Sequence, residues 1–298
     1  MSELITTRAP AKINLALSVG SPEADGMHPI ASWMMTVNLY DELELKKLLP
    51  QSQSRFATIW HDEATRKADI DWPFQKDLSA RAHHALEERV GRKLLIQSTL
   101  RKRIPLGGGV GGGSSDAAMM LIGLNHLFDL GLERSELADI GREVGSDIPF
   151  LVHGGSAIVE GRGEQVENLA DPPEIHAVLA FPDLGCPTAE VYHRFDELET
   201  GRSVDPERVR NVAKNPSFDA PFNDLAAPAF DLFPALKKIS EDLESLAERP
   251  AHLSGSGSTI FVLCDDPLHA EQLALVASER LDLPCLSVSG AEGVEMTG

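Results

Sequence analysis

The sequence predicts an α+β protein of two domains. A chain of 298 residues is longer than a domain with a single hydrophobic core usually is, so two domains are expected. The composition changes at Asp171-Pro172-Pro173, which we interpret as the boundary between a domain of residues 1–170 and a domain of residues 171–298. Beyond this boundary the predicted elements follow a β-α-α-β-α-β order, which is typical of a small α+β sandwich with helices on one face of the sheet.

The first predicted strand covers residues 8–19, where apolar and polar residues alternate from Ala11 onward. Lys12 and Asn14 belong to its polar face, which in an ordinary half-buried strand points to solvent. Further strands are predicted over 32–47, 56–60, 94–100, 156–160, 175–181, 259–264 and 284–289. Helices are predicted over 78–90, from Ser135 to Gly145, and over 188–199, 205–213, 229–247 and 267–280.

The stretch from Pro105 to Ala118 carries the strongest functional signal. Between Gly107 and Gly113 only Val110 has a side chain. Glycine costs conformational entropy on folding, so such a run indicates backbone N–H groups that approach a bound anion closely. An apolar pattern of helical period follows, and we expect the helix to start at Ser114, Ser115 and Asp116 and to end at Gly131. A glycine loop before a helix N-terminus predicts a phosphate-binding site.

Two common nucleotide-binding loops do not fit this stretch. The P-loop requires a lysine directly after its last glycine, and Gly113 is followed by serine. The dinucleotide-binding fingerprint requires an acidic residue at a strand end about 20 residues further on, whereas Glu136 and Asp139 lie in a helical pattern. A flexible linker is the remaining alternative, and the apolar strand and apolar helix on either side argue against it.

The overall charge excludes some classes of partner. A formal net charge of −19 argues against general nucleic-acid binding and against anionic membrane surfaces. Local positive charge for a phosphate would come from Arg101, Lys102 and Arg103, just before the loop. The three cysteines lack metal-ligand or redox spacing, and neither a membrane-spanning run nor a targeting segment is visible, so we expect a cytoplasmic protein.

Three single residues are candidates for the chemistry, and each has a simpler interpretation. Lys12 is either a solvated strand lysine or a cation directed at a phosphoryl group. Asp147 is either the N-cap of a following turn or a carboxylate that accepts a hydroxyl proton beside the loop. His28 is either a surface group or part of a binding site. Residues 254–258 form either a hairpin loop or a second anion-binding loop.

Taken together, four stretches resemble the ordered motifs of the GHMP small-molecule kinases. They are Pro-Ala-Lys-Ile-Asn-Leu (10–15), the glycine-rich stretch 105–118, Gly-Ser-Asp-Ile-Pro-Phe (145–150) and Leu-Ser-Gly-Ser-Gly-Ser (253–258). The resemblance implies the two-domain GHMP kinase fold, with an N-terminal domain like domain 2 of ribosomal protein S5 and a ferredoxin-like C-terminal domain. It also implies a kinase that uses ATP and Mg²⁺.

The same resemblance implies roles for individual residues. Lys12 and Asp147 match the catalytic pair of the family. The ATP phosphates would be bound by Pro105, Leu106, Gly107, Gly108, Gly109, Val110, Gly111, Gly112, Gly113, Ser114 and Ser115. The acceptor would be bound by Asn14, Met27, His28, Thr188 and Tyr192. We assign no metal site to the protein alone; the hydroxyl of Ser114 or Ser115 is the one ligand we offer for Mg²⁺.

Within the family, the chain resembles one branch most closely. The doubled glycine triplet, the Asp-Gly-x-His turn (25–28) and Asn223-Asp224-Leu225 are similar to that branch. That branch phosphorylates the 2-hydroxyl of 4-diphosphocytidyl-2-C-methyl-D-erythritol in non-mevalonate isoprenoid precursor synthesis. The resemblance implies the same reaction for this chain, which we expect to be a monomer or a homodimer. Met27 departs from the branch, which has a tyrosine there, and Pro29-Ile30 replaces its usual Glu-Leu. Two alternatives stay open: a kinase for another alcohol such as homoserine, and a non-catalytic nucleotide-binding regulator on the same fold.

Overall fold

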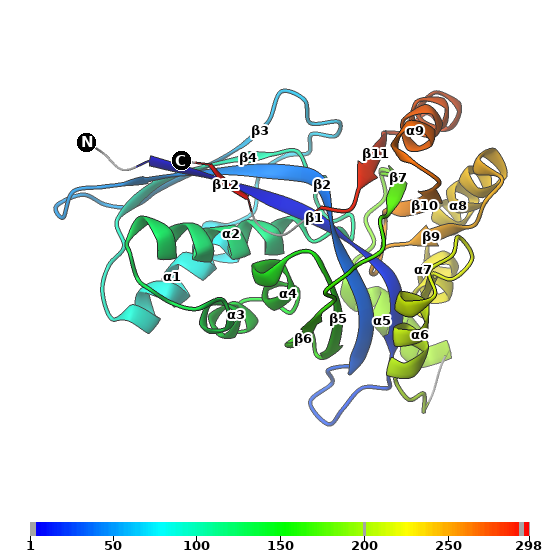
Figure 1. Ribbon diagram of the computed structural model, residues 1–298, viewed down its shortest axis with the longest axis horizontal. Coiled ribbons are helices and arrows are strands. Elements are labelled where there is room, and N and C mark those ends of the chain that lie inside the picture. Colours follow the sequence, from blue (N-terminus) through cyan, green and yellow to red (C-terminus); the bar gives the residue numbers. More distant parts are fainter. Residues whose placement is uncertain (1–3, 199–200, 292–294, 298) are drawn as a thin grey trace.

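Two β-sheets organise the chain in the computed structural model, which describes residues 4–198, 201–291 and 295–297 (Figure 1). The first sheet has the strand order β12-β1-β2-β4-β3. In that order the strands cover Glu295–Thr297, Leu4–Val19, Ile30–Lys47, Ile96–Lys102 and Arg55–Trp60. β5 (Ser156–Gly161) pairs with β2 and with β6 (Gln165–Asn168), and the short β8 (Phe222–Asn223) lies parallel to β1.

Four helices pack together on one face of this sheet (Figure 1): α1 (Leu78–Val90), α2 (Gly112–Leu127), α3 (Arg134–Arg142) and α4 (Ile148–His153). A cluster of buried apolar side chains joins them to the strands, among them Leu43, Leu86, Leu121 and Phe150. Most side chains of α2 are buried, because this helix lies between the sheet and the other helices. A short 3₁₀ helix, Phe74–Lys76, precedes α1.

The second sheet is antiparallel throughout, in the order β11-β7-β10-β9. These strands cover Cys285–Ser289, His176–Ala180, Ile260–Cys264 and Ala251–Leu253. The accompanying helices are α5 (Thr188–Leu198), α6 (Pro206–Lys214), α7 (Ala226–Leu232), α8 (Pro234–Ala247) and α9 (Pro267–Leu281). This mixture of helices and sheets is the α+β class that the sequence predicts; the boundary between residues 1–170 and 171–298 stays a prediction. Within the described ranges, no helix combines the length and the apolar composition that crossing a bilayer needs.

β1 is buried on both faces, because it lies against both halves of the molecule. Every residue from Ala11 to Val19 is buried. Ile13 belongs to a second apolar cluster that includes Phe181 and Phe261 near the second sheet. The expectation of a solvent-facing polar side is therefore wrong for this strand: Lys12 is only 4% exposed. A buried lysine needs polar partners, and these come from the site described below.

The ends of α2 differ from the sequence prediction. The helix begins at Gly112, with Gly111 as its N-cap, so Ser114 and Ser115 lie inside the first turn and Asp116 follows it. It also ends early, at Leu127, four residues before Gly131. Glycine at the N-cap lets the chain turn from a left-handed conformation directly into the helix, which brings the helix N-terminus closer to the glycine loop.

Two other helix starts depend on residues whose role the pattern did not reveal. Glu133 is the N-cap of α3 and forms a capping box with Glu136, so Ser135 is already helical. The predicted helix 229–247 is divided into α7 and α8 by Pro234. Proline has no N–H to continue α7, but it is well suited to the first position of α8.

Candidate active site

The glycine-rich loop runs from the end of β4 to the N-terminus of α2 in a backbone conformation that favours glycine. Gly107, Gly109 and Gly111 have φ values of +70°, +74° and +71°, in the left-handed region. Gly111 is the N-cap of α2 and carries no capping side chain, so the N–H groups of the first turn depend on other partners. A bound anion is such a partner.

A second loop, residues 254–258, packs directly on the glycine-rich loop. The N–H of Thr259 donates to the carbonyl oxygen of Gly108 at 3.0 Å, and the hydroxyl of Ser254 donates to that of Gly109 at 3.2 Å. A Cβ atom on Gly109 would lie 2.7 Å from the carbonyl oxygen of Gly257. The loop 254–258 is thus the hairpin connection between β9 and β10, and its contacts make glycine necessary at position 109.

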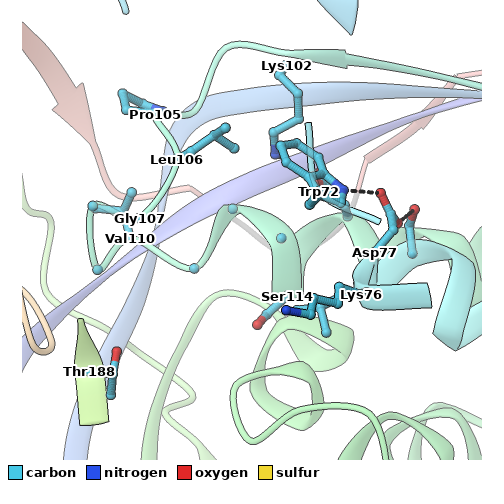
Figure 2. A pocket seen from close by; sticks show the side chains of 18 residues that line it. Trp72, Lys76, Asp77, Lys102, Pro105, Leu106, Gly107, Val110, Ser114 and Thr188 are labelled. Carbon is cyan, nitrogen blue, oxygen red and sulfur yellow. Dashed lines mark hydrogen bonds and ion pairs between the residues drawn. The ribbon is translucent and has the colours of Figure 1, made fainter. Parts of the chain in front are cut away.

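A cavity of about 480 Å³ lies over the glycine-rich loop and the first turn of α2 (Figure 2). Its described lining includes the loop residues predicted to bind ATP, with the exception of Ser115, whose side chain is fully buried. Trp72 and Lys76, from the segment before α1, also line the cavity. The indole N–H of Trp72 donates to Oδ2 of Asp77 at 3.1 Å, which orients the ring at this wall (Figure 2).

The positive charge at this cavity comes from a residue that the sequence analysis missed. Lys102 is buried and its charge is balanced by carboxylates, while Arg103 pairs with Glu42 and Glu63. Lys76 instead lines the cavity and forms no ion pair with any residue in the described ranges. Lys76 and Ser114 line the same cavity (Figure 2). The segment before α1 has no regular apolar pattern, so sequence periodicity gave no reason to select Lys76.

A second cavity, of about 710 Å³, adjoins the first, and the two share Gly109, Gly111 and Thr188 as lining residues. Its lining brings together every residue predicted to be catalytic or to bind the acceptor: Lys12, Asn14, Met27, His28, Asp147, Thr188 and Tyr192. These residues come from β1, the turn after it, the start of α4 and α5. The glycine-rich loop therefore lies between two adjoining cavities.

Lys12 and Asp147 face each other in the second cavity, with 3.5 Å between Nζ and Oδ2. Lys12 also donates to Oδ1 of Asn14 at 2.6 Å, and the amide of Asn14 donates to the hydroxyl of Ser32 at 2.9 Å. Asp147 occupies the N-cap position of α4, but within the described chain its carboxylate accepts no capping hydrogen bond. The interpretation of Asp147 as a simple cap therefore lacks the bond that it requires.

The far end of the second cavity is aromatic. The ring centroids of His28 and Tyr192 are 4.8 Å apart, and Nε2 of His28 lies 2.8 Å from Oδ1 of Asp196. Burial, together with the charge of Asp147, raises the pKa of Tyr192 to about 12, so its hydroxyl stays protonated at physiological pH. Met27 is 49% exposed at the mouth of this cavity. A ring, a hydrogen-bonding imidazole and a thioether are suitable surfaces for a planar heterocycle.

Two family profiles match the chain: the GHMP kinases N terminal domain over residues 77–155 and the GHMP kinases C terminal domain over residues 207–283. The chain belongs to the GHMP kinase family. This GHMP kinase is 38% identical over 276 residues to a protein of Exiguobacterium sibiricum named 4-diphosphocytidyl-2-C-methyl-D-erythritol kinase, covering 90% of this chain and 92% of the relative. A relative of the same name from Bacillus velezensis is 38% identical over 263 residues, with 87% and 88% covered.

Solved structures agree with this assignment. A crystal structure of 4-(cytidine 5'-diphospho)-2C-methyl-D-erythritol kinase has a TM-score of 0.77 and 31% identity, covering 96% of this GHMP kinase and 99% of that chain. A homoserine kinase from Cytophaga hutchinsonii has a TM-score of 0.68 but only 16% identity over 100% and 98% of the two chains, so it shares the fold alone. The family resemblance, the GHMP kinase fold and the use of ATP expected from the motifs are therefore confirmed.

Proposed function

We propose that the chain transfers the γ-phosphoryl group of ATP to the 2-hydroxyl of 4-diphosphocytidyl-2-C-methyl-D-erythritol. The observation that carries this proposal is the pair of adjoining cavities, which share Gly109, Gly111 and Thr188 beside the Lys12–Asp147 pair. The relatives that are similar over most of the chain are named as kinases of this substrate. The reaction would then belong to non-mevalonate isoprenoid precursor synthesis and would take place in the cytoplasm.

The glycine-rich loop is proposed to bind the ATP phosphates. Its backbone N–H groups, together with the N-terminus of α2, offer donors and a positive dipole end to negative charge that grows in the transition state. Lys76 adds an exposed cation at the same cavity. Mg²⁺ usually binds phosphate oxygens and few protein groups; the Ser114 hydroxyl lines the cavity and would hold it, whereas the Ser115 hydroxyl is buried. Bound there, Mg²⁺ would neutralise phosphate charge.

Asp147 is proposed to orient the acceptor hydroxyl and to receive its proton. The hydroxyl oxygen forms the new bond to the γ-phosphorus, the bond to the bridging oxygen of ADP breaks, and the hydroxyl proton passes to the Asp147 carboxylate. Lys12 stabilises the ionised carboxylate across 3.5 Å and offers positive charge to the transferring group. Asn14 holds the Lys12 ammonium in place and contacts the polar end of the acceptor.

The cytidine end of the acceptor is proposed to bind between His28 and α5. Tyr192 supplies a stacking face for the base, and His28, held by Asp196, supplies a hydrogen-bonding edge. Thr188 lies where the two cavities meet and bonds to the hydroxyl of Ser256 at 3.0 Å, so it is available to the middle of the acceptor. Met27 takes the second face of the base with a flexible side chain.

A panel of alcohols tests this function directly. The protein is incubated with ATP, Mg²⁺ and either the cytidyl substrate, homoserine or mevalonate, and ADP release is followed. We expect kcat/KM for the cytidyl substrate to exceed the others by about 100-fold or more, which is about 2.7 kcal/mol of transition-state discrimination. Equal turnover of homoserine would favour the alternative that the protein is a kinase for another alcohol. ATP binding without turnover of any alcohol would favour the alternative that it is a non-catalytic nucleotide-binding regulator.

A further inference from the structure

Lys102, Asp41 and Asp116 form a buried ionic cluster beneath the glycine-rich loop. The Lys102 side chain, at the end of β4, is 1% exposed, and its ammonium donates to Oδ2 of Asp41 and, at 2.6 Å, to Oδ2 of Asp116. The two aspartates come from β2 and from the N-terminal part of α2, where Asp116 is the fifth residue. None of the three has a part in the phosphoryl transfer described above.

The members of the ionic cluster are attached to opposite ends of the loop. Oδ1 of Asp41 accepts hydrogen bonds from the backbone N–H groups of Arg103 and, at 2.9 Å, Ile104, which lead into the loop. Asp116 lies where the chain leaves the loop. The two ends also touch, since a Cβ atom on Gly112 would lie 2.9 Å from Cγ2 of Ile104. Lys102 therefore connects the entry of the loop to its exit.

Three buried charges are a costly way to stabilise a protein, because apolar side chains of similar volume often do as well or better. Burial and the charge of Asp41 raise the pKa of Asp116, while Lys102 acts in the opposite direction. Oδ1 of Asp116 has no hydrogen-bond partner among the described residues, so the position of this carboxylate depends on Lys102. The cost and the geometry both indicate that the cluster sets positions rather than adding stability.

We propose that the ionic cluster holds the glycine-rich loop in its phosphate-binding conformation, acting as three positioning residues whose charged groups do not bind ATP. This inference rests on the role proposed above for the loop. Lys102 borders the nucleotide cavity (Figure 2), but its ammonium is occupied by two carboxylates. The described lining of that cavity does not include Asp41, so a change at Asp41 removes no direct contact with ATP.

The variant Asp41→Asn tests the proposal, because it keeps the shape of the side chain and removes its charge. We expect ATP·Mg²⁺ to bind about tenfold more weakly or worse by calorimetry, since misplaced N–H groups lose charge-assisted bonds to phosphate. The matched control is Glu87→Gln on α1. Glu87 is also a buried carboxylate that pairs with a lysine, Lys93, at 2.7 Å and accepts a backbone N–H, that of Leu94, at 2.8 Å. The Glu87→Gln variant should lose thermal stability but bind ATP with the same affinity as the parent protein.

Equal ATP affinity in Asp41→Asn and Glu87→Gln would overturn the proposal and leave the cluster a purely stabilising one. If Asp41→Asn does not fold, Asp41→Glu replaces it in the same comparison, because it keeps the charge but displaces the carboxylate at a residue outside the cavity lining, with the same expected loss of ATP affinity and the same contradicting result. ATP binding is measured here without any acceptor. Failure of the protein to phosphorylate the cytidyl substrate would therefore count against the proposed function but not against the cluster.

Discussion

Nζ of Lys12 and Oδ2 of Asp147 are 3.5 Å apart, and we propose these two side chains as the catalytic pair. Replacing Asp147 with Asn keeps the size of the side chain but removes the proposed proton acceptor. We expect kcat to fall by roughly 10²–10⁴-fold while the dissociation constant of ATP stays nearly unchanged. Steady-state kinetics measures kcat, and calorimetry measures the dissociation constant of ATP. Near-parental kcat would show that Asp147 is not the proton acceptor, since asparagine cannot take up the proton but serves at an N-cap position about as well as aspartate.

Tyr192 and Met27 test the binding of the cytosine ring. Base–aromatic stacking contributes about 1–3 kcal/mol, so Tyr192→Ala should raise the KM for the cytidyl substrate about tenfold or more. Met27→Tyr should lower the same KM several-fold and leave kcat and the KM for ATP almost unchanged, because only uniform binding is altered. The measurement is a substrate titration at saturating ATP. If the KM for the cytidyl substrate is unchanged in Tyr192→Ala, the Tyr192 ring does not stack on the base.

Residues with a motif around them were predictable, and residues positioned by distant contacts were not. Lys12, Asp147 and His28 stand in recognisable stretches, and they line one cavity as expected. Lys76 stands in a segment without a pattern, and only the fold brings it beside the loop. Lys102 looked like a cation for phosphate, but Asp41, 61 positions away in the chain, takes up its charge. No local signal in the sequence reports such a contact.

At the scale of elements, the glycine-rich loop offers a clean comparison between two glycines of similar conformation. Both Gly107 and Gly109 have φ near +70°, but a Cβ atom on Gly107 would meet nothing within 4 Å, whereas one on Gly109 would collide with the backbone of the loop 254–258. Gly107→Ala should therefore show only the conformational cost, about 1–2 kcal/mol. Gly109→Ala should in addition separate the two loops and weaken ATP binding by more than about tenfold. Urea unfolding and calorimetry measure both quantities, and equal ATP affinities would mean that the loop contact is dispensable.

Element type was more predictable than element ends. The helix at 78–90 is found with the same bounds, because Asp77 caps it with a side-chain hydrogen bond and Gly91 ends it in a left-handed conformation. The start of α2 was misplaced because serines normally cap helices, whereas here glycine does so in order to bring backbone N–H groups toward the cavity. The short strands β8 and β9 were missed because two or three residues show no period.

At the scale of the whole molecule, the arrangement of the two cavities predicts the kinetic mechanism. The cavities adjoin at the glycine-rich loop and share Gly109, Gly111 and Thr188. ATP and the acceptor can then be bound at the same time, with the γ-phosphoryl group and the acceptor hydroxyl at the shared wall. Direct transfer requires this ternary complex and no phosphorylated protein. Initial rates with both substrates varied should therefore give intersecting double-reciprocal lines.

The contrasting mechanism is a covalent one, in which a side chain such as Asp147 takes the phosphoryl group before the acceptor binds. It predicts parallel lines, and it predicts exchange of label between ADP and ATP in the absence of acceptor. Direct transfer predicts no such exchange, because the phosphoryl group has no protein atom to occupy when the second cavity is empty. The Asp147→Asn variant serves as the control, since it removes the carboxylate that the covalent route would use. Exchange in the parent protein that disappears in Asp147→Asn would contradict the arrangement of two cooperating cavities proposed here.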